Sequence, residues 1–317
     1  MENLLLLTDN SELDLSAYRN LGVHIFTEAT IKPSDYASIT IMFGWKPDIS
    51  KKVLTATGSS LKWLQTFSAG VDYLPLAQLK AKHILVSNMS GVHAIPISQT
   101  ILLYALYFAR DLPRVLADAE QKHWTDQHNF GEVVTLDDLT WTIFGTGHIG
   151  SELARLLKSF HAKVIGVNRT GHSAANFDET YAQSDWRKAV ADTDVIVNIM
   201  PLTKETAHFY DKTFFDFLKS AYLFVNVGRG GSVDTTALIE ALHSDHLQHA
   251  ALDVFEQEPL PSSSPLWQMP NVLVTPHYSA QMPHLGRAWD KILLPNLEQF
   301  MKDGTVATNR VNMKNGY

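Results

Sequence analysis

Short apolar runs recur along the chain, separated by polar stretches or by segments with helical spacing. In the first third they lie at Leu4–Leu7, His24–Phe26, Ile39–Phe43, Leu64–Phe67 and Ile84–Val86. Further runs follow at Trp141–Phe144, Lys163–Val167, Asp194–Met200, Tyr222–Val227, Ala250–Val254 and Val272–Val274. Such runs, bounded by turn residues, are typical of buried strands, and their alternation with helices predicts parallel α/β sheets.

Three other segments are helical in character. Residues 94–110 form an apolar stretch with Pro96 near its start, where a first helical turn tolerates proline. Thr235–His243 predicts a shorter helix, and residues 285–317 are helical at first and then irregular. By contrast, residues 112–140 are polar, and Trp124 with Asn129–Gly131 indicates irregular structure there.

A glycine-rich turn joins a predicted strand to a predicted helix. Trp141–Phe144 is followed by Gly145-Thr146-Gly147-His148-Ile149-Gly150, and then by apolar residues at helical spacing. Lys163–Val167 completes a βαβ unit, so the G-x-G-x-x-G pattern predicts a dinucleotide-binding Rossmann turn. Gly145 would allow the tight turn, Gly147 the approach of a pyrophosphate, and Gly150 close packing of helix on sheet. N–H groups at the helix start would hold the phosphates.

The end of the second strand bears on the choice of cofactor. An acidic residue usually grips the ribose 2′-hydroxyl of NAD at this position, and here the chain has Asn168, Arg169 and Thr170. Asn168 does not repel a 2′-phosphate, Arg169 can pair with one, and Thr170 adds a hydroxyl. We therefore expect NADP(H) in preference to NAD(H). The alternative is that Arg169 is a solvated loop charge.

Composition narrows the class of protein. The 317 residues suffice for two domains, and the net charge of −7 without a basic patch argues against a nucleic-acid surface. The chain has no cysteine, which excludes thiolate nucleophiles and suits a reducing compartment. The longest apolar run, Ile101–Ala109, is too short to span a bilayer, and the first residues lack the features of a signal peptide. We expect a cytoplasmic protein without nucleic-acid or membrane partners.

Three successive strands near the C-terminus are followed by a charged or titratable residue: Arg229, Glu258 and His277. The carboxyl ends of parallel strands share one sheet edge, so these side chains should gather beside the cofactor. Imidazole titrates near neutral pH, so His277 could donate a proton to a ketone while Glu258 orients its ring. Arg229 could bind the carboxylate of a 2-keto acid. Taken singly, each of the three could equally be structural.

Six segments carry a resemblance to a known family: FSAGVD (67–72), FGTGHIG (144–150), PLTKET (201–206), NVGRGGSVDTTAL (226–238), ALDVFEQEPLP (251–261) and VTPHYSA (274–280). In order and separation they resemble the D-isomer-specific 2-hydroxyacid dehydrogenases. The GWKP and WLQTFSAGVD segments are similar to the NADPH-preferring glyoxylate/hydroxypyruvate reductase branch. The resemblance implies a 2-keto acid reductase that uses NADPH and forms a homodimer.

The resemblance also implies a domain plan and residue roles. It implies an α/β fold, with a Rossmann-type doubly wound parallel sheet domain at 99–284 and a smaller flavodoxin-like substrate domain at 1–98 and 285–317. Arg229, Glu258 and His277 would be catalytic, and backbone N–H groups of Ala69, Gly70 and Val71 would bind the substrate carboxylate. Asp253 would contact the nicotinamide carboxamide. Further cofactor contacts would come from Gly145, Thr146, Gly147, His148, Ile149, Gly150, Asn168, Arg169, Thr170, Pro201, Thr206, Val227 and Gly228.

Some features leave alternatives open. Gln99, Asp245 and His249 depart from residues common in the family, and we interpret them as structural drift. His243, His246 and His249 are spaced by three, and a solvated cluster is favoured over a metal site. Trp45, Tyr278, Met282 and Trp289 could face the substrate or pack in a core. A dinucleotide-sensing corepressor-like binding protein is the alternative function, since such relatives keep the catalytic residues.

Overall fold

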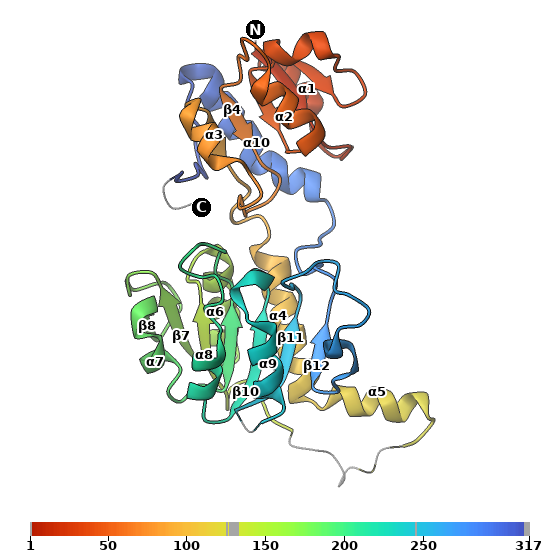
Figure 1. Ribbon diagram of the computed structural model, residues 1–317, viewed down its shortest axis with the longest axis vertical. Coiled ribbons are helices and arrows are strands. Elements are labelled where there is room, and N and C mark those ends of the chain that lie inside the picture. Colours follow the sequence, from red (N-terminus) through yellow and green to blue (C-terminus); the bar gives the residue numbers. More distant parts are fainter. Residues whose placement is uncertain (1, 125, 127–132, 245, 314–317) are drawn as a thin grey trace. The chain divides into compact units, whose positions relative to one another are not determined.

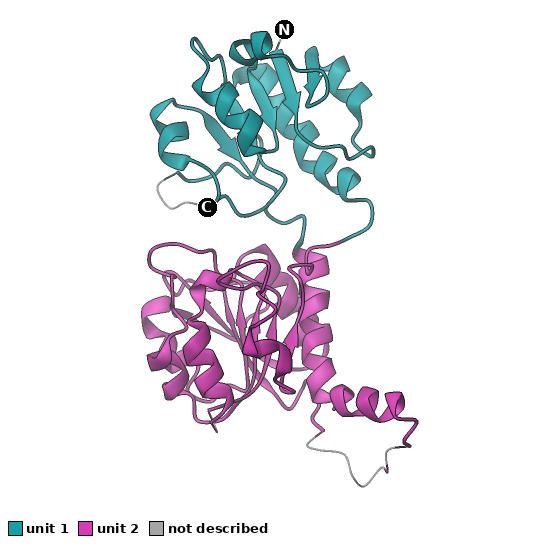
Figure 2. Ribbon diagram, turned by 45° about the vertical axis from the view of Figure 1, so that its right-hand side comes forward, with its two compact units in different colours: residues 1–93, 282–317 teal, residues 94–281 magenta. Residues whose placement is uncertain are grey.

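The computed structural model describes residues 2–124, 126, 133–244 and 246–313, which form two compact units (Figure 2). Unit 1 comprises residues up to 93 together with those from 282 onward, and unit 2 comprises residues 94–281. The family resemblance implied domain boundaries at 98/99 and 284/285. In the structure the units change at 93/94 and 281/282, and the helix that begins at Ala94 lies entirely in unit 2. The expectations for Asn129–Gly131 and Asp245 lie outside the described residues.

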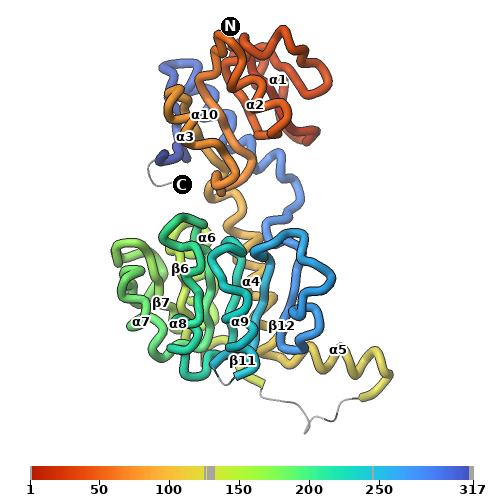
Figure 3. The backbone as a smooth tube through the Cα atoms, viewed as in Figure 1, coloured from red at the N-terminus to blue at the C-terminus, as the bar shows by residue number. Residues whose placement is uncertain are grey.

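Unit 1 contains the N-terminal segment, red to orange in Figure 1, and the blue C-terminal helix. It is built on a five-stranded parallel sheet in the order β2-β1-β3-β4-β5, which is the flavodoxin-like order. Its strands are β1 (Glu2–Leu6), β2 (Val23–Thr27), β3 (Ile41–Phe43), β4 (Trp63–Gln65) and β5 (Leu85–Ser87). Its helices are α1 (Leu15–Asn20), α2 (Pro47–Thr55), α3 (Leu76–Ala81), α10 (Leu285–Asp303) and the 3-10 turn η1 (Pro33–Ser38). The backbone trace in Figure 3 shows α10 returning to lie with the N-terminal elements.

The strands of unit 1 bury both faces, because successive side chains point to opposite sides. Leu5, Met42 and Leu64 belong to one core, while Leu4, Phe43 and Trp63 belong to the other. The second core also takes side chains of α10, including Leu293 and Leu297. This burial explains why the apolar runs are continuous instead of alternating.

Unit 2 has a seven-stranded parallel sheet in the order β12-β11-β10-β9-β6-β7-β8. The strands are β6 (Thr140–Phe144), β7 (Lys163–Asn168), β8 (Glu179–Ala182), β9 (Val195–Asn198), β10 (Ala221–Asn226), β11 (Leu247–Leu252) and β12 (Val272–Val274). The chain starts at the centre with β6, runs outward to β8, and then returns to β9 on the other side of β6. This reversal is the doubly wound Rossmann topology, and ligands of such sheets bind at the reversal point.

Helices cover both faces of this sheet. α4 (Ala94–Ala109) and α6 (His148–Ser159) pack on one face through Ile101 and Leu153. α8 (Lys212–Phe217) and α9 (Thr235–Leu242) cover the other face through Phe214 and Leu238. The remaining helical elements are α5 (Leu112–Glu120), α7 (Trp186–Ala189), η2 (Gln183–Asp185), η3 (Gly230–Ser232) and η4 (Pro265–Gln268).

Helix α5 and strand β8 are among the elements that the sequence did not predict. Helix α5 occupies part of the segment interpreted as irregular, and it buries none of its residues. Strand β8 has the polar sequence ETYA and lies at the sheet edge beside β7. A strand paired on one side needs no apolar run, so the hydrophobic pattern could not show it.

Candidate active site

The carboxyl ends of the unit 2 strands carry most of the predicted site. Because all seven strands are parallel, these ends lie along one sheet edge. β6 leads into the glycine turn and β7 into Asn168–Thr170, on one side of the reversal. On the other side, β10 leads into Arg229, β11 into Asp253, and β12 into His277. The topology thus brings residues more than 100 positions apart to one edge.

His277 and Glu258 form a pair at this edge. The Nδ1 atom of His277 lies 2.8 Å from Oε2 of Glu258, and both side chains are partly open to solvent. The other carboxylate oxygen of Glu258 accepts a hydrogen bond of 3.0 Å from the Phe255 N–H. A carboxylate only accepts, so Nδ1 carries the hydrogen, and Nε2 is left to face a reactant.

Arg229 is half-buried on a turn that the backbone fixes tightly. Its carbonyl oxygen accepts hydrogen bonds from Ser232 Oγ (2.6 Å) and Asn226 Nδ2 (3.3 Å). The adjacent Gly230 approaches Phe255 so closely that an added Cβ would lie 1.9 Å from its carbonyl carbon. The turn of Arg229 therefore packs against the segment that leads to Glu258.

The glycine turn has the geometry that a bound dinucleotide requires. Gly145 has φ of +111°, in a region that only glycine adopts readily. A Cβ on Gly150 would lie 1.9 Å from the Gly145 carbonyl oxygen, whereas a Cβ on Gly147 would meet nothing within 4 Å. The space in front of Gly147 is thus open to a ligand, at the start of α6 where N–H groups lack helical acceptors.

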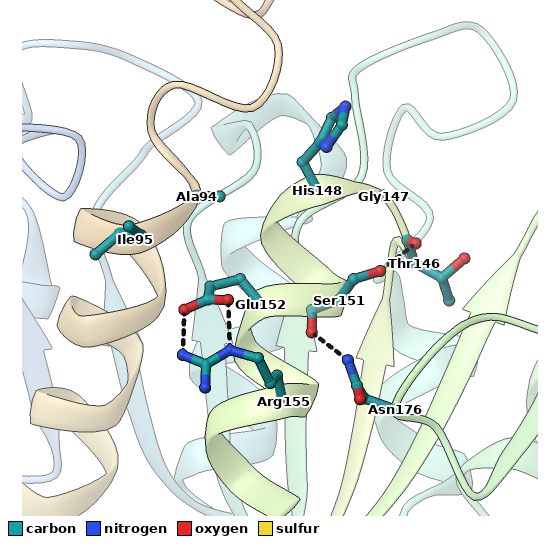
Figure 4. A pocket seen from close by; sticks show the side chains of 9 residues that line it. All are labelled: Ala94, Ile95, Thr146, Gly147, His148, Ser151, Glu152, Arg155 and Asn176. Atoms are coloured by element: carbon teal, nitrogen blue, oxygen red, sulfur yellow. Dashed lines mark hydrogen bonds and ion pairs between the residues drawn. The ribbon is translucent and has the colours of Figure 1, made fainter. Parts of the chain in front are cut away.

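A cavity of about 560 Å³ opens beside the start of α6 (Figure 4). Glu152 and Arg155 form a bidentate ion pair in its wall, and Ser151 Oγ donates to the Thr146 carbonyl oxygen. The cavity is lined by Ala94, Ile95, Thr146, Gly147, His148, Ser151, Glu152, Arg155 and Asn176. It therefore brings His148 and Thr146, both predicted cofactor contacts, to one hollow; Ile149 is only partly buried on the same turn.

The segment after β7 is a compact turn. Asn168 Oδ1 accepts hydrogen bonds from the N–H groups of Thr170 (3.3 Å) and Gly171 (2.8 Å), and its amide donates to the His172 carbonyl oxygen. Arg169 and Thr170 are exposed, and the Thr170 hydroxyl lies 3.1 Å from His172 Nδ1. Sequence reasoning missed His172, because its position beside Thr170 depends on this turn.

The other predicted cofactor residues lie on neighbouring turns. Thr206 is buried, and its hydroxyl donates to the Pro201 carbonyl oxygen over 2.7 Å, which closes the turn after β9. Val227 and Gly228 follow β10 and are buried. Asp253 is completely buried, and its carboxylate accepts hydrogen bonds from residues 275, 278 and 279.

The predicted carboxylate-binding loop belongs to unit 1. The carbonyl of Ala69 accepts a hydrogen bond from Asn88 Nδ2 (2.7 Å), and that of Gly70 accepts one from Ser68 Oγ (2.8 Å). Val71 is buried in a core. Side chains of unit 1 thus fix the loop by donating hydrogen bonds to its carbonyl oxygens.

The four side chains that could face the substrate differ in their surroundings. Trp289 is buried and lies against Phe67 with ring centroids 4.3 Å apart, so it belongs to a core. Trp45 is half-buried against the core of unit 1, and Met282 is half-buried in the same unit. Tyr278, next to His277, is 36% exposed and can still face a ligand.

The histidine prediction is wrong in one respect. His243 is exposed, but His249 lies in β11, where its ring stacks on Phe108 at 4.5 Å. Its strand position puts it inside the packing of α4 on the sheet, so it is not part of a solvated cluster. Within the described residues no group of three acidic, histidine or cysteine side chains could hold a metal ion, and no helix is long and apolar enough to cross a membrane.

Comparison with known proteins agrees with this geometry. Residues 102–279 match the family model of the D-isomer specific 2-hydroxyacid dehydrogenase NAD binding domain. The glyoxylate/hydroxypyruvate reductase B of Citrobacter koseri is 36% identical over 223 residues, which cover 68% of each chain.

Two solved structures extend the likeness to the whole chain. A D-isomer specific 2-hydroxyacid dehydrogenase family protein from Aeromonas salmonicida is 31% identical with a TM-score of 0.82, covering 98% of this chain and 99% of that one. The NADPH-dependent glyoxylate/hydroxypyruvate reductase SmGhrA of Sinorhizobium meliloti, in complex with NADP and sulfate, is 26% identical with a TM-score of 0.83, covering 100% of both chains.

Proposed function

The chain belongs to the D-isomer specific 2-hydroxyacid dehydrogenase family, and from this premise we propose that it reduces a 2-keto acid to a D-2-hydroxy acid with NADPH. One observation carries the proposal: the His277–Glu258 pair lies at the same sheet edge as the open glycine turn. A proton donor and a dinucleotide site on one edge are what carbonyl reduction requires.

The residues of the chain have distinct roles in this reaction. Bound NADPH supplies the hydride. His277 gives the proton from Nε2 to the substrate carbonyl oxygen, while Glu258 holds the hydrogen on Nδ1 and orients the ring. Arg229 binds the substrate carboxylate and offsets charge that develops on the carbonyl oxygen. Backbone N–H groups of Ala69, Gly70 and Val71 are further candidate donors to a carboxylate.

The preference for NADPH rests on the turn after β7. Asn168 is neutral and is used within the turn, which leaves Arg169 and Thr170 exposed toward solvent. A 2′-phosphate would meet a guanidinium and a hydroxyl there, and the neutral Asn168 would not repel it. The NADP bound to SmGhrA, a structural neighbour, supports the same choice.

A panel of 2-keto acids, including glyoxylate, hydroxypyruvate, pyruvate and phenylpyruvate, tests the proposal by loss of NADPH absorbance. His277→Gln should lower kcat by at least about 100-fold and leave NADPH binding intact. His284→Gln is a matched control, because His284 Nδ1 also lies 2.8 Å from a glutamate and also has positive φ. Full turnover by His277→Gln, or no turnover by the wild type across the panel, would reject the proposed reaction.

We also propose that the chain forms a homodimer. Helix α5 buries none of its residues and exposes Leu116, and α4 exposes Leu103 and Leu106. Apolar side chains gathered on two consecutive helices indicate a surface that a second copy covers. Light scattering should give twice the monomer mass for the wild type and a smaller mass for Leu103→Asp; a monomeric wild type would contradict this.

The alternative of a corepressor-like binding protein gains no support from these relatives, which are described as reductases or dehydrogenases. It predicts tight NADPH binding without turnover, so the same keto-acid panel distinguishes the two functions.

A further inference from the structure

Asp253 is a carboxylate in a place where a charge is costly. The residue follows β11 and is completely buried. Its Oδ1 accepts hydrogen bonds from the Thr275 hydroxyl (2.7 Å) and the Tyr278 N–H (2.9 Å), and its Oδ2 accepts one from the Ser279 N–H (3.0 Å). A buried carboxylate is stable only where such donors replace water, so these bonds are strongly coupled to the fold.

The donors to Asp253 lie on both sides of His277. Thr275 precedes it by two positions, and Tyr278 and Ser279 follow it directly. His277 has φ of +51°, the left-handed conformation that residues other than glycine adopt at a cost of about 1 kcal/mol or more. Surrounding contacts must over-determine such a conformation for it to persist. The carboxylate of Asp253 supplies them on both sides.

Tyr104 on α4 completes the network. Its hydroxyl lies 2.6 Å from Thr275 Oγ1 and 3.5 Å from Asp253 Oδ1, and its side chain is almost entirely buried. Burial raises the pKa of Tyr104 far above its usual value, so the phenol stays protonated. Since the Thr275 hydroxyl donates to Asp253, its oxygen is the acceptor for Tyr104. Tyr104 thus donates a hydrogen bond to Thr275, and Thr275 donates one to Asp253.

We propose that Tyr104, Thr275 and Asp253 are positioning residues that fix the 275–279 turn and thereby hold His277 against Glu258. The proposal rests on the proposed function, in which His277 donates the proton. It adds a role for Asp253 beyond the nicotinamide contact implied by the family resemblance. A catalytic group displaced by about 1 Å can lose about 100-fold in rate, so side chains that act only through the placement of His277 can govern kcat.

Three variants of threonine test this. Thr275→Val removes the hydroxyl and keeps the shape, whereas Thr275→Ser keeps the hydroxyl. Thr142→Val is the control, because Thr142 is likewise a threonine of unit 2 with a hydrogen-bonded hydroxyl. That hydroxyl bonds to the Ala189 carbonyl oxygen and to Thr193 Oγ1, both at 2.9 Å, and Thr142 is completely buried whereas Thr275 is half-buried. We expect Thr275→Val to lower kcat by about 10- to 100-fold with the KM and Kd for NADPH within about twofold. Thr275→Ser should restore most of the rate.

A second readout does not depend on turnover. Hydrogen exchange of peptides covering 275–281 should be faster in Thr275→Val than in Thr142→Val at equal global stability. The reason is that Asp253, which accepts from the Tyr278 and Ser279 N–H groups, loses the hydroxyl donor that helps to fix it. Equal kcat for the two valine variants, or equal exchange in this segment, would overturn the positioning role. If the wild type reduces no keto acid, the proposed function fails, and the exchange result alone decides whether the network holds the turn.

Discussion

At the scale of single residues, the side chains proposed as catalytic were easier to associate from the sequence than those proposed to hold them. His277, Glu258 and Arg229 each follow a strand, so the rule that strand ends share an edge was enough to associate them. Tyr104 gave no such signal. In the sequence Tyr104 is indistinguishable from the apolar residues around it in helix α4. Its contact with Thr275 depends on how that helix crosses the sheet. His172 was missed for the same kind of reason.

Arg169 leads to a prediction about cofactor choice. Arg169→Ala should raise the KM for NADPH about tenfold and leave the KM for NADH within about twofold, because a charge-assisted bond to the 2′-phosphate would be lost. Steady-state kinetics with both cofactors measures this. Arg187→Ala is the control, since Arg187 is an exposed cation of unit 2 that stacks on Trp186. Equal effects of Arg169→Ala on both cofactors would show that the guanidinium does not read the phosphate.

At the scale of elements, the glycine turn separates a folding role from a binding role. Gly150→Ala should destabilise the protein by about 1–3 kcal/mol, because the new Cβ would overlap the Gly145 carbonyl oxygen at 1.9 Å. Gly147→Ala should change stability by less than about 1 kcal/mol, since φ is −75° and no atom lies within 4 Å of the added Cβ.

For NADPH affinity we expect the opposite order, with the larger effect at Gly147. A methyl group on Gly147 would occupy the space through which a pyrophosphate approaches, so we expect the Kd for NADPH to rise by at least about tenfold. Urea denaturation and fluorescence titration of NADPH measure the two effects. Unchanged NADPH affinity in Gly147→Ala would remove this turn from the cofactor site.

Elements were predictable where burial shaped their composition. The core strands β6, β9 and β10 are buried along nearly their full length, and their apolar runs appear plainly in the sequence. Strand β8 and helix α5 bury little, so their sequences carry no comparable pattern. Strand ends shifted by two or three residues between expectation and structure at the start of β3 and at both ends of β11, because hydrophobicity marks burial and not the hydrogen-bonded ladder.

At the scale of the whole molecule, the discontinuous unit 1 is the feature that the hydrophobic pattern could not predict. Leu293, Leu297 and Phe300 show that α10 is amphipathic, but periodicity does not say which sheet takes its apolar face. The structure buries these residues with Leu4, Phe43 and Trp63. The family resemblance predicted that the C-terminal helix joins the N-terminal domain, because in that family the substrate domain is built from both segments.

His249 gives the stability of the molecule a dependence on pH. His249 is a residue of strand β11, and its ring stacks on Phe108 of α4. Its Nδ1 is buried without a hydrogen-bond partner among the described residues. Burial lowers the pKa of His249 to about 4, against a smaller opposing effect of Asp111. In the unfolded chain the imidazole has a pKa of about 6.5. Between these values the unfolded chain binds a proton that the folded chain does not.

Stability should therefore fall as the pH drops from about 6.5 toward 4, by at most about 3 kcal/mol from this group. His249→Phe keeps a ring against Phe108 and removes the titration, so its free energy of unfolding should change less between about pH 7 and pH 5 than that of the wild type. His243→Gln, which removes an exposed histidine nearby, should keep the wild-type dependence. Urea denaturation at both pH values measures the difference. Equal losses in His249→Phe and the wild type would mean that the packing of α4 on the sheet tolerates an imidazolium, and that the acid sensitivity of the fold arises elsewhere.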